Sequence, residues 1–319
     1  MKKLLLTLLV GMFIATSLSA ASLGKGKMKA SMSAGYKMVT TENWSVNQFD
    51  IAQQSGFAFL STNAAGLSFS YGIMDDLDVT YTMPTYQMQF VSGEGVMIPV
   101  PGVPQPMKAE SVDTTNTKTL GSPLLGVTYY KDLGSLGLRV APYLGLPFLE
   151  MYSTEKTAVI GGNEGKSDDD GDVNFDQQTL AGVSLAIDSK GTSKMFWQGW
   201  LNLQAGFGGD IDMTMTTVLS GLFGYKFAPT SFAKLQLFWI TPNLLAKDTT
   251  VGEVTVKALG FGDSTLKIST LYGMNVTDNS GFNVSLWATM SFTEEAKMTP
   301  MGEKATFVGG LTLDYWMKF

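Results

Sequence analysis

Apolar and polar residues alternate along much of this chain with a period of two, and the pattern is clearest in residues 311–319. Successive side chains of an extended strand point to opposite sides, so one face here is wholly apolar. That face carries Leu311, Leu313, Tyr315, Met317 and Phe319. An apolar outer face ending in an aromatic residue is typical of a barrel strand in a bilayer, and a half-buried edge strand of a soluble sandwich is the alternative.

The same alternation recurs along the chain and predicts about twelve strands. They are expected near 28–37, 66–73, 77–83, 121–130, 136–148, 175–188, 195–207, 212–227, 231–243, 263–275, 281–293 and 304–319. An even number of strands places both ends of the chain on the same side of the membrane. The predicted fold is therefore all-β: a closed antiparallel transmembrane β-barrel of about 12 strands with both termini in the periplasm.

Short and long connections between these strands also alternate. The short ones are 74–76, 131–135, 188–194, 228–230 and 276–280, and the long ones lie near 38–65, 91–120, 149–174, 244–262 and 294–303, with only 208–211 short among them. Bacterial barrels have short periplasmic turns and longer extracellular loops, so this rhythm supports the barrel and predicts its orientation.

The first residues have the features of an export signal. Met1-Lys2-Lys3 is basic, residues 4–14 are apolar, and Ser19-Ala20-Ala21 offers small residues for cleavage. We expect residues 1–21 to be a signal peptide and 22–319 to be one barrel domain in the bacterial outer membrane. Removing Lys2 and Lys3 from the 22 basic residues leaves 20 against 28 acidic ones, a net charge of −8, which argues against a nucleic-acid partner.

The residues that usually carry enzymatic chemistry are missing. The chain has no His and no Cys, so the common hydrolytic arrangements of a nucleophile with imidazole cannot form. We expect no enzymatic activity, no catalytic residue and no cofactor. The acidic segment 167–176 has alternating oxygen ligands, but its spacing does not match a helix-flanked calcium loop, so no metal ligand is assigned and calcium binding stays open.

Charged residues on the polar faces of the strands are candidates for solute selectivity. Placing each apolar face toward lipid puts the following side chains in the lumen: Arg139, Lys234, Lys267, Asp78 and Asp314. Basic groups exceed acidic ones in this set, which predicts a lumen that favours anions. The alternative is that these groups pair with one another and only stabilise the barrel.

One long connection has an unusual composition. Residues 96–104 are apolar and rich in Pro, and such a segment is costly to leave wholly in water. Three placements avoid this cost: folding into the lumen, covering the mouth of the barrel, or binding a partner. We favour an inward-folded constriction or a solute-contacting surface, with these candidate residues: Val96, Met97, Ile98 and Val100.

The segment Tyr71-Gly72-Ile73-Met74-Asp75-Asp76-Leu77-Asp78-Val79 is similar to the recurring Tyr-Gly-x-x-Asp-x-Leu-Asp segment of a bacterial family of transporters of the meta-pathway for phenol degradation. Pro142–Pro147, followed by an acidic Gly-rich segment and residues 177–187, resembles the middle region of that family. The chain departs from the family at Leu146-Pro147-Phe148, where a Pro-Thr-Gly is expected. The resemblance implies an outer-membrane barrel related to transporters of hydrophobic compounds, and it identifies no catalytic residue.

These observations predict a passive outer-membrane channel or uptake protein for small solutes, hydrophobic or anionic. The alternative is a structural or adhesive surface barrel with a plugged lumen, whose extracellular loops bind partners. The expected partners are outer-membrane lipid, the barrel-assembly machinery through Phe319, and a small-molecule solute.

Overall fold

The computed structural model describes most of the barrel and parts of its connections. The described residues are 22–45, 54–83, 85–94, 97–98, 107–108, 111–120, 123–146, 148–150, 152–160, 163–169, 174–176, 179–189, 194–207, 213–242, 244–245, 249–251, 254–256, 263–291 and 305–319. The expected signal peptide therefore lies outside the described residues. Among the residues that the structure describes, no helix is long and apolar enough to cross a membrane.

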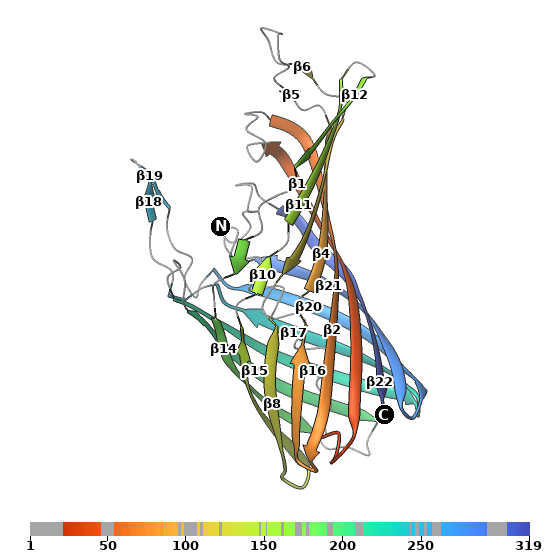
Figure 1. Cartoon of the computed structure of the whole chain (residues 1–319). Coiled ribbons are helices and arrows are strands. Elements are labelled where there is room, and N and C mark those ends of the chain that lie inside the picture. The colour runs from red at the N-terminus through yellow and green to blue at the C-terminus, as the bar shows by residue number, and fades with distance from the viewer. Residues whose placement is uncertain are drawn as a thin grey trace.

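Twelve antiparallel strands close into a barrel, as the alternating pattern predicts (Figure 1). They are β1 (Met28–Ser45), β2 (Gln54–Met74), β3 (Leu77–Thr82), β8 (Leu124–Asp132), β9 (Leu136–Gly145), β14 (Thr179–Ser189), β15 (Met195–Phe207), β16 (Thr214–Ala228), β17 (Ser231–Ile240), β20 (Thr265–Thr277), β21 (Ser280–Ser291) and β22 (Ala305–Lys318). The short turns join consecutive strands at one end, which we call the short-turn end.

The first and last strands close the barrel. β1 pairs with β2 on one side and with β22 on the other. At the short-turn end the Met28 amide donates to the carbonyl oxygen of Phe319 over 3.1 Å, and the Phe319 amide donates to the carbonyl oxygen of Met28 over 2.9 Å. Because every barrel strand has two neighbours, the barrel wall has no free edge at which another chain could pair.

Four further strands extend the wall beyond the barrel at the opposite end (Figure 1). They are β4 (Thr85–Glu94), β7 (Ser111–Leu120), β11 (Tyr152–Ile160) and β12 (Asn163–Asp169). The long strand β2 makes this possible, because its residues 68–74 pair with β3 whereas its residues 58–65 pair with β4. We call these four strands the extension.

The prediction that 38–65, 91–120 and 149–174 are loops is therefore wrong over much of their length. Residues 38–45 and 54–65 continue β1 and β2, and the extension occupies much of the other two segments. The segment 111–119 is rich in Thr, which favours strands, but it has few apolar residues. A strand with polar residues on both faces has no apolar alternation, so this pattern could not reveal it.

Three two-stranded sheets also lie in the connections. They are β5 (Met97–Ile98) with β6 (Met107–Lys108), β10 (Phe148–Glu150) with β13 (Asn174–Asp176), and β18 (Thr249–Val251) with β19 (Val254–Val256).

The two faces of the barrel wall differ sharply in polarity. Large apolar side chains such as Leu219, Phe223 and Leu286 are exposed on the outer face, at 56%, 65% and 61%. On the inner face Arg139 and Asn202 are each only 2% exposed. The inner face also carries a cluster of buried apolar residues: Ala186, Trp200, Val218, Phe238 and Ile240. An apolar exterior around a largely polar interior is the arrangement that a membrane barrel needs.

Large rings on the inner face lie over glycines of the neighbouring strand. In each of five cross-strand pairs, a side chain at the glycine would collide with the ring opposite. The pairs are Tyr143 with Gly182, Phe196 with Gly224, Phe232 with Gly273, Trp316 with Gly281, and Trp287 with Gly310. Glycine in a strand commonly marks such a close approach, and here it lets wide rings lie flat against a curved wall.

Gly310 supplies a test of barrel closure. A methyl group at this position would overlap the Tyr36 carbonyl oxygen of β1 and lie 2.7 Å from Cζ2 of Trp287. Because a backbone oxygen cannot rotate away, we expect Gly310→Ala to destabilise the closed barrel by about 3 kcal/mol, the upper end for overpacking. The heat-modifiable folded fraction on a gel measures this, with Gly199→Ala as the control because its methyl group would meet nothing within 4 Å. Equal folded fractions for the two variants would contradict the described closure.

Candidate functional site

The barrel interior is the candidate site, and all five charged residues proposed from the sequence lie on it. Asp78, Arg139, Lys267 and Asp314 are buried, and Lys234 is partly buried. They come from β3, β9, β20, β22 and β17, respectively. The structure separates them into three groups according to their contacts.

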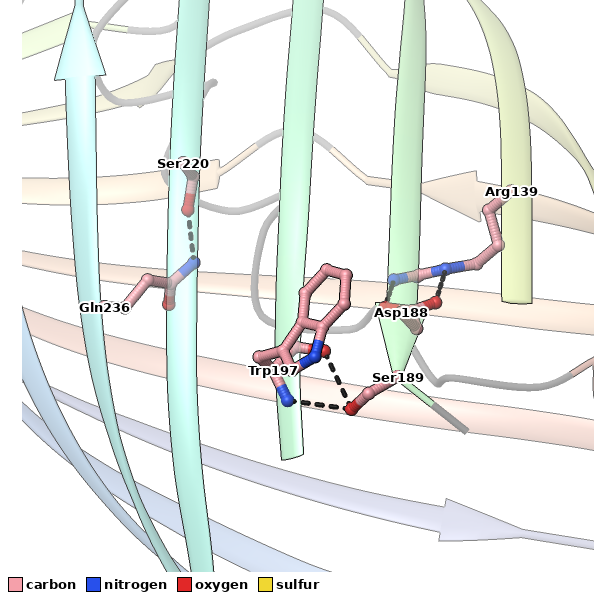
Figure 2. Close-up of polar contacts among 6 residues, drawn as sticks. All are labelled: Arg139, Asp188, Ser189, Trp197, Ser220 and Gln236. Carbon is pink, nitrogen blue, oxygen red and sulfur yellow. Dashed lines mark hydrogen bonds and ion pairs between the residues drawn. The ribbon is translucent and has the colours of Figure 1, made fainter. Parts of the chain in front are cut away.

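Arg139 forms an ion pair inside the barrel. Its Nε and Nη2 atoms each donate to a different oxygen of Asp188 over 2.9 Å, and Figure 2 shows the side chain reaching across to that carboxylate. The two residues are not directly opposite, because Arg139 faces Ala186 in the strand register and Asp188 lies two positions further along β14. The positive charge of Arg139 is therefore locally balanced.

Asp78 holds the segment 22–27, which folds back against the inner wall. Ser22 Oγ donates to Asp78 Oδ1 over 2.7 Å, and the Leu23 amide lies 3.3 and 3.1 Å from the two carboxylate oxygens. Further along, the Gly26 amide donates to the carbonyl oxygen of Gly72 over 2.8 Å. The segment thus occupies the interior beside β2 and β3, near the short-turn end, and we call it the inner segment.

Gly72 permits this arrangement because the backbone of Gly24 passes directly over it. A methyl group at Gly72 would overlap the carbonyl oxygen of Gly24. Gly24 itself has a φ of 87°, in the left-handed region that favours glycine. The Tyr71-Gly72 pair of the family-like segment therefore has a local structural role here: its glycine makes room for the inner segment.

The third group contains Lys234, Lys267 and Asp314. Neither oxygen of Asp314 accepts a hydrogen bond, although both lysines lie within electrostatic range of it. The lysines instead lie over aromatic rings, which attract cations through their π faces. Lys234 Nζ is 4.7 Å from the centre of the Phe232 ring, and Lys267 Nζ is 4.5 Å from that of Trp287.

Neutral polar side chains connect the wall between these charges. The Tyr143 hydroxyl lies 3.2 Å from Asn202 Oδ1 and 3.0 Å from Gln204 Oε1, and Ser184 Oγ donates to Asn202 Oδ1 over 2.8 Å. Gln236 Nε2 donates to Ser220 Oγ over 3.0 Å (Figure 2). These bonds fix the side chains that line the interior.

The proposed constriction residues have a different position. Met97 and Ile98 form β5, which Figure 1 shows beside the extension, on the side of the barrel away from the short turns. Val96 and Val100 lie outside the described residues. Of the acidic segment, 167–169 belongs to β12 and 174–176 to β13, and the described residues contain no group of three or more metal-ligating side chains.

The sequence pattern did not reveal the contacts that hold the charged groups of Arg139 and Asp78 inside the barrel. It placed Arg139 and Asp78 in the lumen but did not identify the Asp188 partner or the inner segment. The pairing of Arg139 with Asp188 can be predicted only when the register between β9 and β14 is known. The position of Ser22 depends on the fold of the inner segment, whose sequence has no periodic pattern.

The sequence matches no protein-family model, and no curated protein is significantly similar to it. The fold is similar to an outer membrane channel from Pseudomonas putida F1, with 12% identity, a TM-score of 0.50, and 94% of this chain and 98% of that chain covered. The translocator domain of the autotransporter NalP from Neisseria meningitidis gives 10% identity and a TM-score of 0.48, with 100% and 94% covered. The toluene transporter TbuX from Ralstonia pickettii gives 9% and 0.43, with 93% and 90% covered.

At such low identity, the likeness to the Pseudomonas putida protein shows a shared fold. The wall is a closed antiparallel barrel with an apolar outer face and a polar inner face. Together these features show that the chain is a bacterial outer-membrane β-barrel protein.

The inner segment can be tested through Gly72. We expect Gly72→Ala to displace residues 22–24, because the new methyl group and the Gly24 carbonyl oxygen cannot occupy the same space. The chain has no Cys, so Leu23→Cys introduces a single thiol on the inner segment. In this background we expect Gly72→Ala to accelerate the reaction of the thiol with a water-soluble maleimide about tenfold. That factor corresponds to a loss of ~1.4 kcal/mol in the free energy that holds the inner segment against the wall. Gly221→Ala is the control, since its methyl group would meet nothing within 4 Å. Equal reaction rates in the two variants would show that the inner segment is not held at Gly72.

Proposed function

We propose that this protein is a passive outer-membrane channel for small anionic solutes that carry an apolar part, with the barrel interior as their route. The observation that carries the proposal is the excess of basic side chains on the inner wall, together with the positions of Lys234 and Lys267. Both lysines lie over aromatic rings, and the oxygens of Asp314 accept no hydrogen bond from them. A wall built only for stability would be expected to bond these opposite charges directly.

The charges of the wall support anion preference. Among the barrel-strand side chains that the structure describes, the buried or partly buried basic residues of the inner face are Lys29, Lys37, Arg139, Lys234, Lys267 and Lys318, whereas the acidic ones are Asp78, Asp188 and Asp314. A narrow lumen with low-dielectric walls focuses such a field and raises the local concentration of anions. Rings such as Phe196 and Phe232 beside Lys234 offer a surface to the apolar part of a solute.

We also infer the orientation of the barrel in the membrane and its partners. Short turns face the periplasm in bacterial barrels, so the short-turn end, with the inner segment and Phe319, faces the periplasm and the extension faces outward. Lipid covers the apolar outer face. The Phe319 side chain is 65% exposed on the folded barrel, and we assign to it the contact with the barrel-assembly machinery.

A second candidate is a sealed barrel that serves as a surface protein. Its support is the burial of the interior, where Arg139 and Asn202 are 2% exposed and Asp78 is 3% exposed. In that case the interior only stabilises the barrel, and the extension is the binding surface.

Replacing Lys234 and Lys267 together tests the proposed channel. We expect Lys234→Gln combined with Lys267→Gln to move the reversal potential in a salt gradient toward cation preference. The shift should grow at low salt, because the screening length rises from about 10 Å at 0.1 M to about 30 Å at 0.01 M. Arg139 is unsuitable for this test, because replacing it leaves the buried Asp188 without its partner.

Two controls define the outcome. Lys131→Gln removes an exposed lysine near a short turn and should leave the reversal potential unchanged. Replacing Lys234 and Lys267 with Arg should retain anion preference because the charge is kept. An unchanged reversal potential in the Gln double variant would contradict anion selection by these lysines, and absence of conductance in the unmodified protein would favour the sealed barrel.

A further inference from the structure

Among the residues that the structure describes, three nitrogen donors on the inner wall have no hydrogen-bond partner. They are Nη1 of Arg139, Nε2 of Gln198 and Nε1 of Trp200, and each atom is buried. A buried donor without a partner costs about 1–3 kcal/mol, so three in one region need an explanation.

The strand register brings the three residues together. Arg139 of β9 is opposite Ala186 of β14, and Ala186 is opposite Trp200 of β15. In the same way Asp188, which binds Arg139, is opposite Gln198. The donors therefore lie on one patch of three adjacent strands, around the small side chain of Ala186.

The chemistry of the patch favours an acceptor with more than one oxygen. The three free groups can only donate, and Arg139 already uses its Nε and Nη2 atoms on Asp188. A water molecule at this position would bring two hydrogens of its own, which need acceptors. A carboxylate has two oxygens with lone pairs for these donors and no hydrogen to place.

The charge of the surroundings supports an anion as well. The pair of Arg139 and Asp188 is neutral as a unit, and Lys234 lies within electrostatic range of both members. Phe196 lies on β15 two positions from Gln198, on the same face, and Lys234 Nζ is 5.8 Å from the centre of its ring. The patch thus combines donors, one additional positive charge and an apolar surface.

We infer that Arg139, Gln198 and Trp200 form a subsite that binds the carboxylate of a solute. The inference rests on the proposed channel and narrows its substrates to carboxylic acids in their anionic form. The guanidinium Nη1, the amide Nε2 and the indole Nε1 donate to the two carboxylate oxygens, while Asp188 holds the guanidinium in position.

The indole group of Trp200 reports directly on the subsite. Protein labelled with ¹⁵N-tryptophan and folded in detergent gives one indole N–H resonance for each of its 6 Trp residues, and Trp200→Phe identifies the relevant one by its loss. We expect sodium formate to move this resonance downfield in a saturable way, because its proton becomes bonded to an anionic oxygen. Formamide, the neutral analogue, should not reproduce the shift at the same concentrations.

Two glutamines of one row provide matched variants. Gln198 and Gln236 are both opposite Leu222, but Gln236 already donates to Ser220, as Figure 2 shows. We expect Gln198→Met to weaken formate binding about tenfold, as for the loss of one hydrogen bond to a charged group, and Gln236→Met to leave it unchanged. Gln198→Glu, which keeps the size and adds a negative charge, provides a second variant if the Met variant does not fold.

The outcomes separate this inference from the channel itself, because binding is measured without conductance. No saturable shift with formate, an equal shift with formamide, or equal weakening by the Gln198 and Gln236 variants would overturn the subsite. Formate binding that Gln198→Met weakens, in a protein without conductance, would retain the subsite and overturn the channel.

Discussion

The contact on which the interior depends is that of a large ring lying flat on a glycine of the next strand. Five such pairs occur on the inner wall, and two of them, Trp316 with Gly281 and Trp287 with Gly310, lie between β21 and β22. Any larger residue at the glycine would push the ring toward the axis. The same rings support ammonium groups, since Lys234 lies over Phe196 and Phe232, and Lys267 over Trp287. The ring–glycine pairs therefore determine where the ammonium groups of Lys234 and Lys267 lie.

Burial on the inner wall makes the remaining polar contacts important. A buried polar group needs a partner, and most of this wall provides one through bonds such as those of Arg139 with Asp188 and of Tyr143 with Asn202. Within the described part of the inner wall, the exceptions are informative because they lie in two groups. Asp314 lacks hydrogen bonds near two ring-bound lysines, and three donors without partners surround Ala186. We propose that Asp314 leaves the ammonium groups of Lys234 and Lys267 free to interact with anionic solutes. We propose that the three donors without partners bind a ligand.

Alternation with a period of two predicted the twelve barrel strands and the inward face of each charged residue, because both depend on local geometry. It failed where the physical cause is not local. Residues 111–119 form a strand in the extension without an apolar face, and the inner segment is held by Asp78, more than fifty residues away. The pattern left open whether Arg139 is available to solutes or paired, because its pairing with Asp188 depends on the register of two strands. The unpaired donors Gln198 and Trp200 likewise appear only when the neighbouring strands are in place.

The central claim is that solutes pass along the polar interior, and a cysteine at Ser220 tests it most directly. Ser220 lies on the inner face of β16, its neighbour Leu219 is 56% exposed on the outer face, and the chain has no other cysteine. We expect a charged methanethiosulfonate reagent to reduce the single-channel current of Ser220→Cys in steps and to leave that of Leu219→Cys unchanged. A current that the reagent leaves unchanged in Ser220→Cys, or the absence of any current in the unmodified protein, would contradict this claim.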